Sequence, residues 1–391
     1  MNSNLPGPLA GLKVIEIGQI AAGPFAGSLL ADLGADVVKV EKPDGGDDLR
    51  RWPPLTPGDE GPEYSENFAS VNRNKRSICV NLKDTGEVTR LRRLCEKADA
   101  LIENYRPGVL ERLGLGYQAL SAGNPRLVYC SINGYGHDGP YAGKGAFDAT
   151  VQAISGLMSV TGEPDGPPVK SGVPFGDFGA GLYAAFCIVS SILRARETGR
   201  GAFIDCSMLG GLLGVAALQT SEHFGTGATP RPTGSAHPRA APYQAFDAQD
   251  APFMVAAGND KLWQDVCDVV GMPELKSDAR FATPLLRAQN QKDLAAILQG
   301  AFRRRTKAEW LAELDRRGVP CAPINTYPEV LADPHVRHRR WVREMTLPNG
   351  AKTRTIAFPM EITGYEFEVY RRPPALGEHT GEVFAEWLGE P

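Results

Sequence analysis

What the sequence lacks argues against several classes of function. The 391-residue chain has 42 Lys and Arg against 46 Asp and Glu, a net charge of -4, so it has no general basic field for nucleic acid. Its first residues, MNSNLPGPLAGLKVIEIG, have no basic segment followed by an apolar one, and we expect no secretory signal. The longest apolar run, residues 181–193, is shorter than the ~20 residues of a membrane span and predicts a buried helix.

The cysteines form no disulfide or metal pattern. There are seven of them, an odd number, and they are widely spaced without any CxxC pair. This spacing is typical of reduced thiols, and no cluster of His and Cys predicts zinc. We therefore expect a cytoplasmic protein without a bound metal.

A dinucleotide fingerprint is also missing, although the order of elements would suit one. Residues 12–18 (LKVIEIG) and 35–41 (ADVVKVE) have strand patterns and flank a helix that begins near Pro24. The turn between them, GQIAAGP, does not fit G-x-G-x-x-G. The sequence thus predicts a parallel sheet with Glu41 at the usual ribose position, but no NAD site.

The strand–helix pattern continues and then changes. Further strands are predicted over residues 77–82, 100–103, 127–132 and 203–206, and helices over 178–196 and 208–218. A Gly- and Pro-rich stretch, residues 223–243, then predicts irregular chain, and amphipathic helices follow it. We predict an α/β protein with a large Rossmann-like domain (1–222), a small α+β domain (223–328) and a C-terminal segment (329–391) that returns to the large domain.

One acidic residue stands out in the segment VKSGVPFGDFGAGLYAAF. Asp177 lies between Gly176 and Phe178 and directly precedes the predicted apolar helix. The positive end of the helix dipole would keep its carboxylate ionised, and small neighbours leave it open to a substrate, as a nucleophile requires. Aspartate is also a common N-cap that only stabilises a helix. The segment alone leaves both interpretations open.

Basic residues gather in clusters that follow predicted strands. NRNKRSICVNLK spans residues 72–83, ENYRPGVLERLG spans 103–114, and Lys42 follows the second strand. Taken singly, each basic side chain is typical of a solvated surface. In an α/β fold, however, ligands bind beyond the carboxyl ends of strands, and Lys and Arg suit phosphate. Together the clusters predict a ligand with several phosphate groups.

A series of longer motifs gives the chain a family resemblance. VIEIGQIAAGPFAGSLLADLGADVVKVEKP, NRNKRSICVNLK, ENYRPGVLERLGLGY, SINGYGHDGP, GDFGAGLYAAF, RRGVPCAPI and PPALGEHT follow one another in family order. Over nearly its whole length the chain resembles the family III CoA-transferases, the CaiB/BaiF group, which includes formyl-CoA transferase and alpha-methylacyl-CoA racemase. The resemblance implies an interlocked homodimer of ring-like chains. It also implies acyl-CoA and a small carboxylic acid as substrates, with no tightly bound cofactor, no nucleic acid and no membrane partner.

The resemblance also assigns roles to residues. Asp177 matches the catalytic nucleophile, which would form an aspartyl anhydride and then an aspartyl-CoA thioester. The residues that match CoA-binding positions are Lys42, Val80, Asn81, Leu82, Lys83, Asn104, Tyr105, Arg106 and Arg112. A loop at the thioester end is matched by Lys144, Phe147 and Asp148.

Phe147 separates two activities within the family. The racemases carry a histidine at this position as half of an acid–base pair, and a phenyl ring cannot exchange a proton. His137, in the nearby loop GYGHDGP, is the alternative proton carrier. The resemblance therefore favours a transferase, with a 2-methylacyl-CoA racemase and a catalytically silent CoA-binding scaffold as the alternatives.

Two departures from formyl-CoA transferase concern the substrate. Ala21 stands where that enzyme has a glutamine, and Gln19 lies two residues away. The loop TGSAHPRAAPYQAF, residues 233–246, lacks the glycine run of that enzyme. We expect a dicarboxylic acyl group such as succinyl rather than formyl or oxalyl, with Arg239 or His237 as candidates to bind a second carboxylate.

Overall fold

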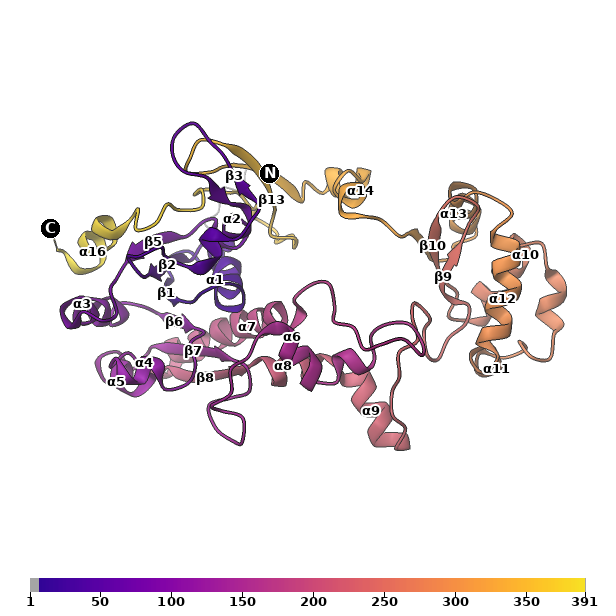
Figure 1. Ribbon diagram of the computed structural model, residues 1–391, viewed down its shortest axis with the longest axis horizontal. Helices are drawn as coiled ribbons and strands as arrows, with labels where there is room; N and C mark the ends of the chain where they lie inside the picture. The colour runs from indigo at the N-terminus through magenta and orange to yellow at the C-terminus, as the bar shows by residue number, and fades with distance from the viewer. Residues whose placement is uncertain (1–6, 391) are drawn as a thin grey trace. The chain divides into compact units, whose positions relative to one another are not determined.

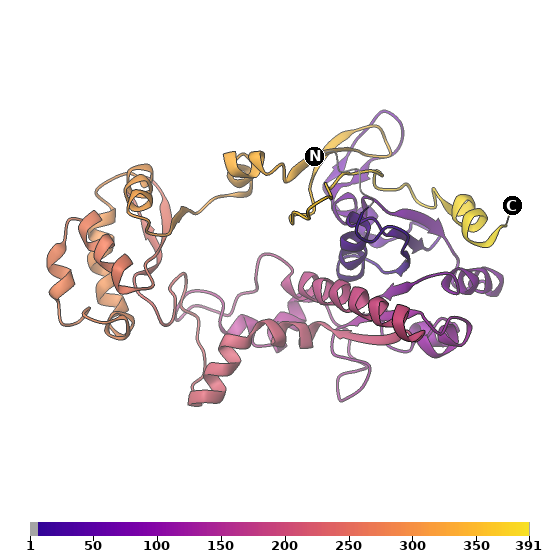
Figure 2. The same cartoon turned by 180° about the vertical axis from the view of Figure 1, so that it is seen from behind.

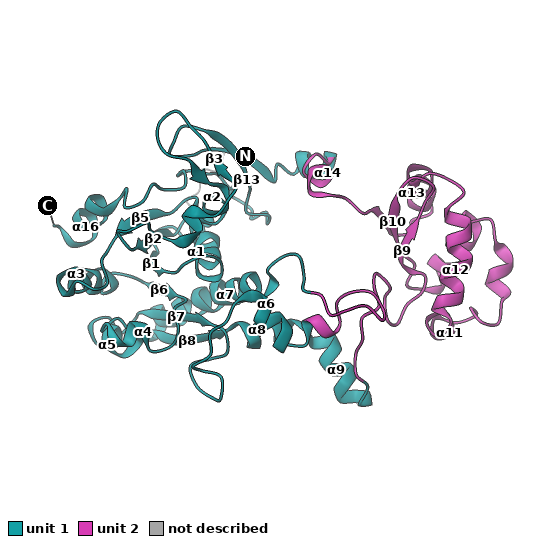
Figure 3. Ribbon diagram, viewed as in Figure 1, with its two compact units in different colours: residues 1–157, 170–228, 334–391 teal, residues 158–169, 229–333 magenta. Residues whose placement is uncertain are grey.

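The computed structural model describes residues 7–390, which divide into two compact units (Figure 3). Within the described residues, the larger unit comprises 7–157, 170–228 and 334–390, and the smaller one 158–169 and 229–333. The larger unit therefore draws on three separate stretches of chain, and its core depends on the last one.

The larger unit is built on a six-stranded parallel sheet in the order β5–β2–β1–β6–β7–β8 (Figure 1). The strands are β1 (Lys13–Ile17), β2 (Asp36–Glu41), β5 (Arg76–Cys79), β6 (Ala100–Glu103), β7 (Val128–Asn133) and β8 (Ala202–Ser207). The central strands are buried on both faces, which explains their nearly continuous apolar sequences. The predicted parallel sheet is confirmed.

Helices pack on both faces of this sheet (Figures 1 and 2). One face carries α1 (Ala22–Asp32), α6 (Asp148–Ile154), α7 (Phe175–Thr198) and α8 (Met208–Val215). The other carries α3 (Thr85–Cys95), α4 (Val109–Arg112), α5 (Tyr117–Gly123) and α16 (Thr380–Leu388). Successive residues of a strand point to opposite faces, so Val14 joins the first core and Ile15 the second.

Within residues 7–390, α7 is the one helix long and apolar enough to cross a membrane. It packs on α1 and β7 and contributes Ala184, Ile188 and Ile192 to the first core. The sequence pattern predicted a helix over residues 178–196, whereas α7 begins at Phe175. Asp177 therefore lies inside the first turn of the helix and does not precede it.

The smaller unit has an antiparallel sheet in the order β11–β10–β9. Its strands are β9 (Tyr243–Asp247), β10 (Pro252–Ala256) and β11 (Cys321–Pro323), and its helices are α10 (Asp260–Val269), α11 (Pro284–Gln289), α12 (Gln291–Phe302), α13 (Lys307–Arg316) and α14 (Tyr327–Leu331). Aromatic rings form its core, where the Phe302 ring lies 5.1 Å from that of Phe253 and 5.2 Å from that of Trp310.

The end of the chain covers an edge of the parallel sheet. The His379 N–H donates to the Ser77 carbonyl of β5 at 2.9 Å, and the Ser77 N–H donates to His379 Nδ1 at 3.2 Å. The last stretch thus pairs the polar groups of an edge strand that would otherwise face water. The remaining elements of the larger unit are β3 (Leu55–Thr56), β4 (Tyr64–Ser65), α2 (Glu66–Asn72), α9 (Ala217–Thr226), α15 (Pro334–His338), β12 (Val342–Thr346) and β13 (Lys352–Ile356).

Candidate active site

A cavity of about 310 Å³ opens at the carboxyl edge of the parallel sheet. It is lined by residues 19–22 after β1, 104–107 after β6, 132–134 at the end of β7, and by Lys144, Ala146, Phe147, Asp177 and Met208. All of these belong to the larger unit. Loops beyond the carboxyl ends of parallel strands are the usual ligand site of an open α/β sheet, so this cavity is the candidate active site.

Asp177 reaches the cavity from the first turn of α7. The N-cap of α7 is Pro174, and Asp177 is the third residue of the helix, so the N-cap interpretation is wrong. Among residues 7–390, no hydrogen-bond donor contacts its carboxylate. The side chain is thus left available to a ligand in the cavity.

The pKa of Asp177 is raised to about 6, first by burial and then by the nearby carboxylate of Asp148. The helix dipole alone would give an easily ionised carboxylate. The structure shows that burial and like charge outweigh the dipole here. Asp177 is still mainly ionised at pH 7, and its raised pKa makes it a stronger base than an exposed aspartate.

Asp148 does not line the cavity but caps α7. Its Oδ1 accepts hydrogen bonds from the N–H groups of Gly176 at 2.8 Å and Asp177 at 3.4 Å, and its Oδ2 accepts from Gln152 Nε2 at 2.7 Å. A Cβ on Gly176 would lie 2.9 Å from Asp148 Oδ1. Gly176 therefore lets Asp148 approach the helix end, because a larger side chain would meet its carboxylate.

Asn104, in the loop after β6, binds the backbone of the loop after β1. Its Oδ1 accepts from the Gln19 N–H at 2.9 Å, and its Nδ2 donates to the Gln19 carbonyl at 2.8 Å. Gln19 Nε2 in turn donates to the Tyr105 hydroxyl at 3.2 Å. The loop after β6 thus holds the loop after β1, in which Ile20 has the left-handed φ of 64°. For a β-branched residue this conformation costs about 1–3 kcal/mol.

Two cations lie at the mouth of the cavity. Arg106 and Lys144 are exposed, and neither has an ion-pair partner within the described chain. The Lys144 ammonium lies 3.8 Å from the centre of the Tyr141 ring, and a Cβ on Gly145 would lie 2.8 Å from the Arg106 guanidinium. Their free charges suit an anionic ligand.

Comparison with known proteins identifies the family. The model of CoA-transferase family III matches residues 9–380. The chain belongs to this family. It is 38% identical over 381 residues to succinyl-CoA:glutarate CoA-transferase of Homo sapiens, which covers 97% of this chain and 86% of the relative. It is 41% identical over 371 residues to acetyl-CoA:oxalate CoA-transferase of Acetobacter aceti, in a match that covers 94% of this chain and 92% of the relative.

The fold agrees with that assignment. A CAIB/BAIF family protein from Brucella suis has a crystal structure that matches with a TM-score of 0.87 at 39% identity, over 98% of this chain and 100% of that one. The protein is therefore a CoA-transferase, and the family resemblance inferred from the motifs is confirmed.

The structure separates the predicted CoA-binding residues of this transferase into two groups. Asn104, Tyr105, Arg106, Lys144 and Phe147 line the cavity with Asp177. Those that do not line it are Lys42, Val80, Asn81, Leu82, Lys83, Arg112 and Asp148.

Most of the second group lies along the same sheet edge. Lys42 follows β2, where its Nζ pairs with Asp48 at 3.0 Å, and residues 80–83 follow β5. Val80 is buried in the core beneath α3, and its N–H donates to the Glu41 carbonyl at 2.8 Å. Arg112 ends α4. An extended ligand that started at Asp177 and followed this edge would pass from β1 and β6 to β2 and β5.

Two further expectations were His137 as a proton carrier, and His237 or Arg239 as the partner of a second carboxylate. His137 does not line the cavity, and its Nε2 lies 2.7 Å from the Ser131 hydroxyl. Phe147, which does line the cavity, is 74% exposed. His237 stacks on Tyr243 at 5.0 Å in the smaller unit, to which Arg239 also belongs.

Sequence reasoning missed several cavity residues. Ile20, Asn133, Gly134, Ala146 and Met208 line the cavity but have no reactive side chain. Their only signal was position, because each follows or ends a predicted strand or loop of the sheet edge. Glu41, the possible ribose ligand, instead accepts two 2.7 Å hydrogen bonds from the Arg50 guanidinium.

Proposed function

We propose that the protein transfers CoA from a dicarboxylic acyl-CoA, such as succinyl-CoA, to a small carboxylic acid, with Asp177 as the nucleophile. The observation that carries the proposal is a partly buried carboxylate, without a hydrogen-bond donor among residues 7–390, on the wall of a cavity whose mouth holds two cations without an ion-pair partner in the same range. The human relative acts, by its name, on succinyl-CoA and glutarate, and the one from Acetobacter on acetyl-CoA and oxalate. Anionic acids of this kind suit the charges of Arg106 and Lys144.

The reaction divides one exchange into four attacks. The Asp177 carboxylate attacks the thioester carbonyl and releases CoA thiolate, which leaves a mixed anhydride. The thiolate attacks the Asp177 carbonyl of this anhydride, so the donor acid leaves and an aspartyl-CoA thioester remains. The acceptor carboxylate attacks that thioester and releases the thiolate again. The thiolate then attacks the acceptor carbonyl of the second anhydride, which yields the new acyl-CoA and free Asp177.

The nucleotide part of CoA would bind away from the reacting atoms. We place it along the ends of β2 and β5, at Lys42 and residues 80–83, with Arg112 at the end of α4 as a further cation. Cations at these places can pair with phosphates while the pantetheine arm reaches the cavity. Binding energy from this remote part would then fix the thioester against Asp177.

An exposed apolar surface supports a homodimer. On α7, Phe186 is 71% and Leu193 59% exposed, and on α9 Leu218 is 62% and Phe224 83% exposed. Large apolar side chains left exposed on these helices favour contact with another chain. We propose that a second copy covers it, in the interlocked arrangement that the family resemblance implies. The seven free cysteines agree with a cytoplasmic location.

The test is an exchange assay in D₂O. Succinyl-CoA is incubated with a panel of mono- and dicarboxylic acids, and every CoA ester is measured by mass spectrometry. We expect new esters mainly from short dicarboxylic acids, and their loss in Asp177→Ala. Asp138→Ala, which removes an exposed carboxylate in the same unit, should leave exchange unchanged.

The same assay separates the alternatives. A 2-methylacyl-CoA that gains deuterium at its α-carbon without new esters would make the protein a racemase. Exchange that persists in Asp177→Ala would refute the role of the nucleophile, and absence of any exchange with bound CoA would leave a scaffold.

A further inference from the structure

We propose that Asp47 and Lys39 are positioning residues for the transfer reaction. Together they hold the loop of residues 18–21, here called the β1 loop, in a strained conformation that shapes the wall of the cavity. Neither residue lines the cavity, and both are buried. The inference rests on the proposed function, because it assigns the two residues to the site of Asp177.

The backbone of the β1 loop is gripped at every polar group between Gly18 and Ile20. Lys39 Nζ donates to the Gly18 carbonyl at 2.8 Å. Asn104 holds both the N–H and the carbonyl of Gln19. The Ile20 N–H lies 3.1 and 3.2 Å from the two carboxylate oxygens of Asp47. These backbone groups are therefore bound by side chains from other segments rather than by hydrogen bonds within the loop.

The conformation of Ile20 explains why such a grip is needed. Its φ of 64° lies in the left-handed region, which a β-branched side chain strongly disfavours. Such strain persists only where the surroundings enforce it, and it gathers at functional sites. The carboxylate of Asp47 binds the N–H of the strained residue itself.

The grip is itself anchored by buried charge. Lys39 Nζ lies 2.9 Å from Asp47 Oδ2 and 3.0 Å from Glu16 Oε1, and all three side chains are fully buried. Burial opposes the charge of Lys39, but the carboxylates of Glu16, Asp47 and Glu41 outweigh it and raise its pKa. Burial likewise opposes the charge of Asp47, but the charge of Lys39 and bonds from the backbone lower its pKa. Each charge of the pair thus favours the ionised form of the other.

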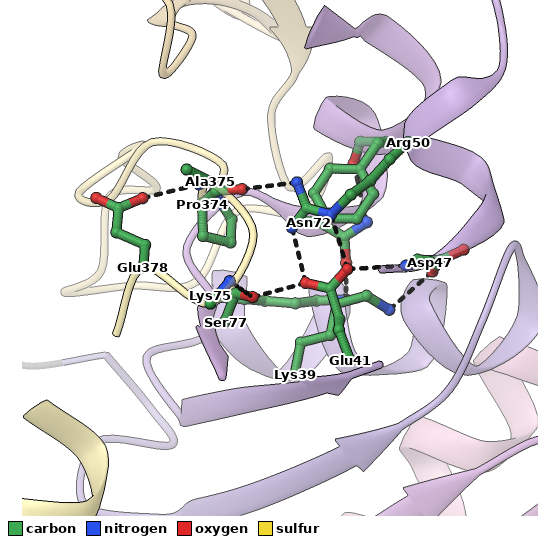
Figure 4. Close-up of polar contacts among 12 residues, drawn as sticks. Lys39, Glu41, Asp47, Arg50, Asn72, Lys75, Ser77, Pro374, Ala375 and Glu378 are labelled. Atoms are coloured by element: carbon green, nitrogen blue, oxygen red, sulfur yellow. Dashed lines mark hydrogen bonds and ion pairs between the residues drawn. The ribbon is translucent and has the colours of Figure 1, made fainter. Parts of the chain in front are cut away.

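Figure 4 shows how this pair continues toward the end of the chain. The Asp47 N–H donates to Glu41 Oε2 at 3.0 Å, and the Arg50 guanidinium binds Glu41 and donates to the Pro374 carbonyl at 3.1 Å. Ser77 donates to Glu41 at 2.6 Å. The position of Asp47 is thus set by the core of the unit and not by the exposed chain around it.

The β1 loop contributes Gln19, Ile20 and Ala21 to the cavity. A shift of this wall would misplace the acyl group against Asp177 while leaving the distant nucleotide contacts intact. Release of the loop should therefore lower kcat far more than it raises the KM for acyl-CoA. Small displacements of positioning groups lower rates by up to about a hundredfold.

The test is a mutant cycle on the full-length enzyme with the acyl-CoA and acid that it exchanges. We expect Asp47→Ala to lower kcat by about tenfold or more, with KM for acyl-CoA changed less than about threefold. Glycine adopts a φ near 64° without strain, so in an Ile20→Gly background Asp47→Ala should cost much less. A loss in kcat that is equal in both backgrounds would overturn the proposal.

A second readout does not depend on transfer activity. Hydrogen exchange of the peptide that contains Ile20 should accelerate in Asp47→Ala, and less so in Asp47→Asn, which keeps an oxygen for the Ile20 N–H. Unchanged exchange in Asp47→Ala would overturn the grip even if the enzyme had a different substrate. Failure of the proposed function would instead appear as an inactive wild type with the exchange pattern intact.

Asp32→Asn is the matched control. Asp32 is equally buried and pairs with Arg73 and Asn74, but neither it nor these partners line the cavity. It should lower Tm and leave kcat unchanged. If it lowers kcat as Asp47→Ala does, the effect of Asp47 is only one of stability, and the proposal is wrong.

Discussion

Two regions that meet at the cavity are built in opposite ways. In the β1 loop, every backbone polar group from Gly18 carbonyl to Ile20 N–H is bound by a side chain. In the first turn of α7, the backbone N–H groups of Gly176 and Asp177 are bound by Asp148, but the carboxylate of Asp177 has no donor among the described residues.

The two regions differ in which of their groups the surrounding residues bind. The wall is fixed by buried charge and absorbs backbone strain. Asp177 is fixed through its backbone N–H, and its carboxylate oxygens receive no hydrogen bond from the described residues. Burial without such bonds raises the pKa of this carboxyl group. Mutations at the cavity, at the α7 cap and at the nucleophile itself test this contrast.

The largest expected effect, apart from loss of Asp177 itself, is at the mouth of the cavity. Arg106→Ala should raise the KM for acyl-CoA or acceptor by about tenfold to a hundredfold, since a charged hydrogen bond contributes about 1.5–3 kcal/mol. Arg106→Lys should recover part of the loss. Arg200→Ala removes an exposed arginine just beyond the far end of α7 and should have no effect. Unchanged kinetics in Arg106→Ala would remove it from the site.

The pH dependence follows from the raised pKa of Asp177. The nucleophile must be ionised, so kcat/KM should fall about tenfold per pH unit below about 6 and level off above about 7. In Asp148→Asn one of the two causes of the shift is gone, and the acid limb should move to lower pH. A pH–rate profile of both enzymes measures this, and a limb that stays in place would show that Asp148 does not act on Asp177.

Two glycines of α7 sharpen the contrast at the level of stability. Gly176→Ala places a methyl group 2.9 Å from Asp148 Oδ1 and should lower the free energy of unfolding by about 1–3 kcal/mol. Nothing lies within 4 Å of a Cβ on Gly179, so Gly179→Ala should be neutral or stabilise the helix by up to about 1 kcal/mol. Urea unfolding of both variants gives the comparison. Equal losses would mean that Asp148 does not require the glycine.

The smallest effect is a gain in stability when the nucleophile is neutralised. The folded-state pKa of Asp177 is raised from 3.8 to about 6, so ionisation lowers the stability of the fold as the pH rises through this interval. The side chain is partly exposed, so solvent screens part of this effect, and Asp177→Asn should be more stable than the wild type by about 1–2 kcal/mol at pH 8, with a gain that vanishes near pH 4. Thermal unfolding at both pH values tests this. A gain that is equal at both would contradict the shift.

Much of the fold was predictable because local patterns determine it. Buried parallel strands require nearly continuous apolar runs, and these marked β1, β2, β6 and β7. Local patterns did not reveal a helix boundary where the apolar run continued across it. Residues 208–218 predicted one helix, but the structure has α8 and α9, which join at Ala216.

The site was predicted less completely than the fold. Asp177 could be found from its glycine-rich setting, and Arg106 and Lys144 from the family motifs. The direction of the pKa shift of Asp177 could not be predicted, because its burial and its distance to Asp148 come from packing between segments 29 residues apart. The role of Asp47 could not be predicted for the same reason, because its partner Ile20 lies 27 residues away in the sequence. The strain of Ile20 is seen only in its backbone φ.

The most direct test of the central claim is to trap the covalent intermediate. The enzyme is mixed with succinyl-CoA without an acceptor, quenched in acid, digested with trypsin and examined by mass spectrometry. We predict that the peptide of residues 171–194 gains the mass of CoA less one water, and that this adduct is absent in Asp177→Asn but present in Asp138→Ala. An adduct on another peptide, or one that persists in Asp177→Asn, would contradict the assignment of Asp177 as the nucleophile.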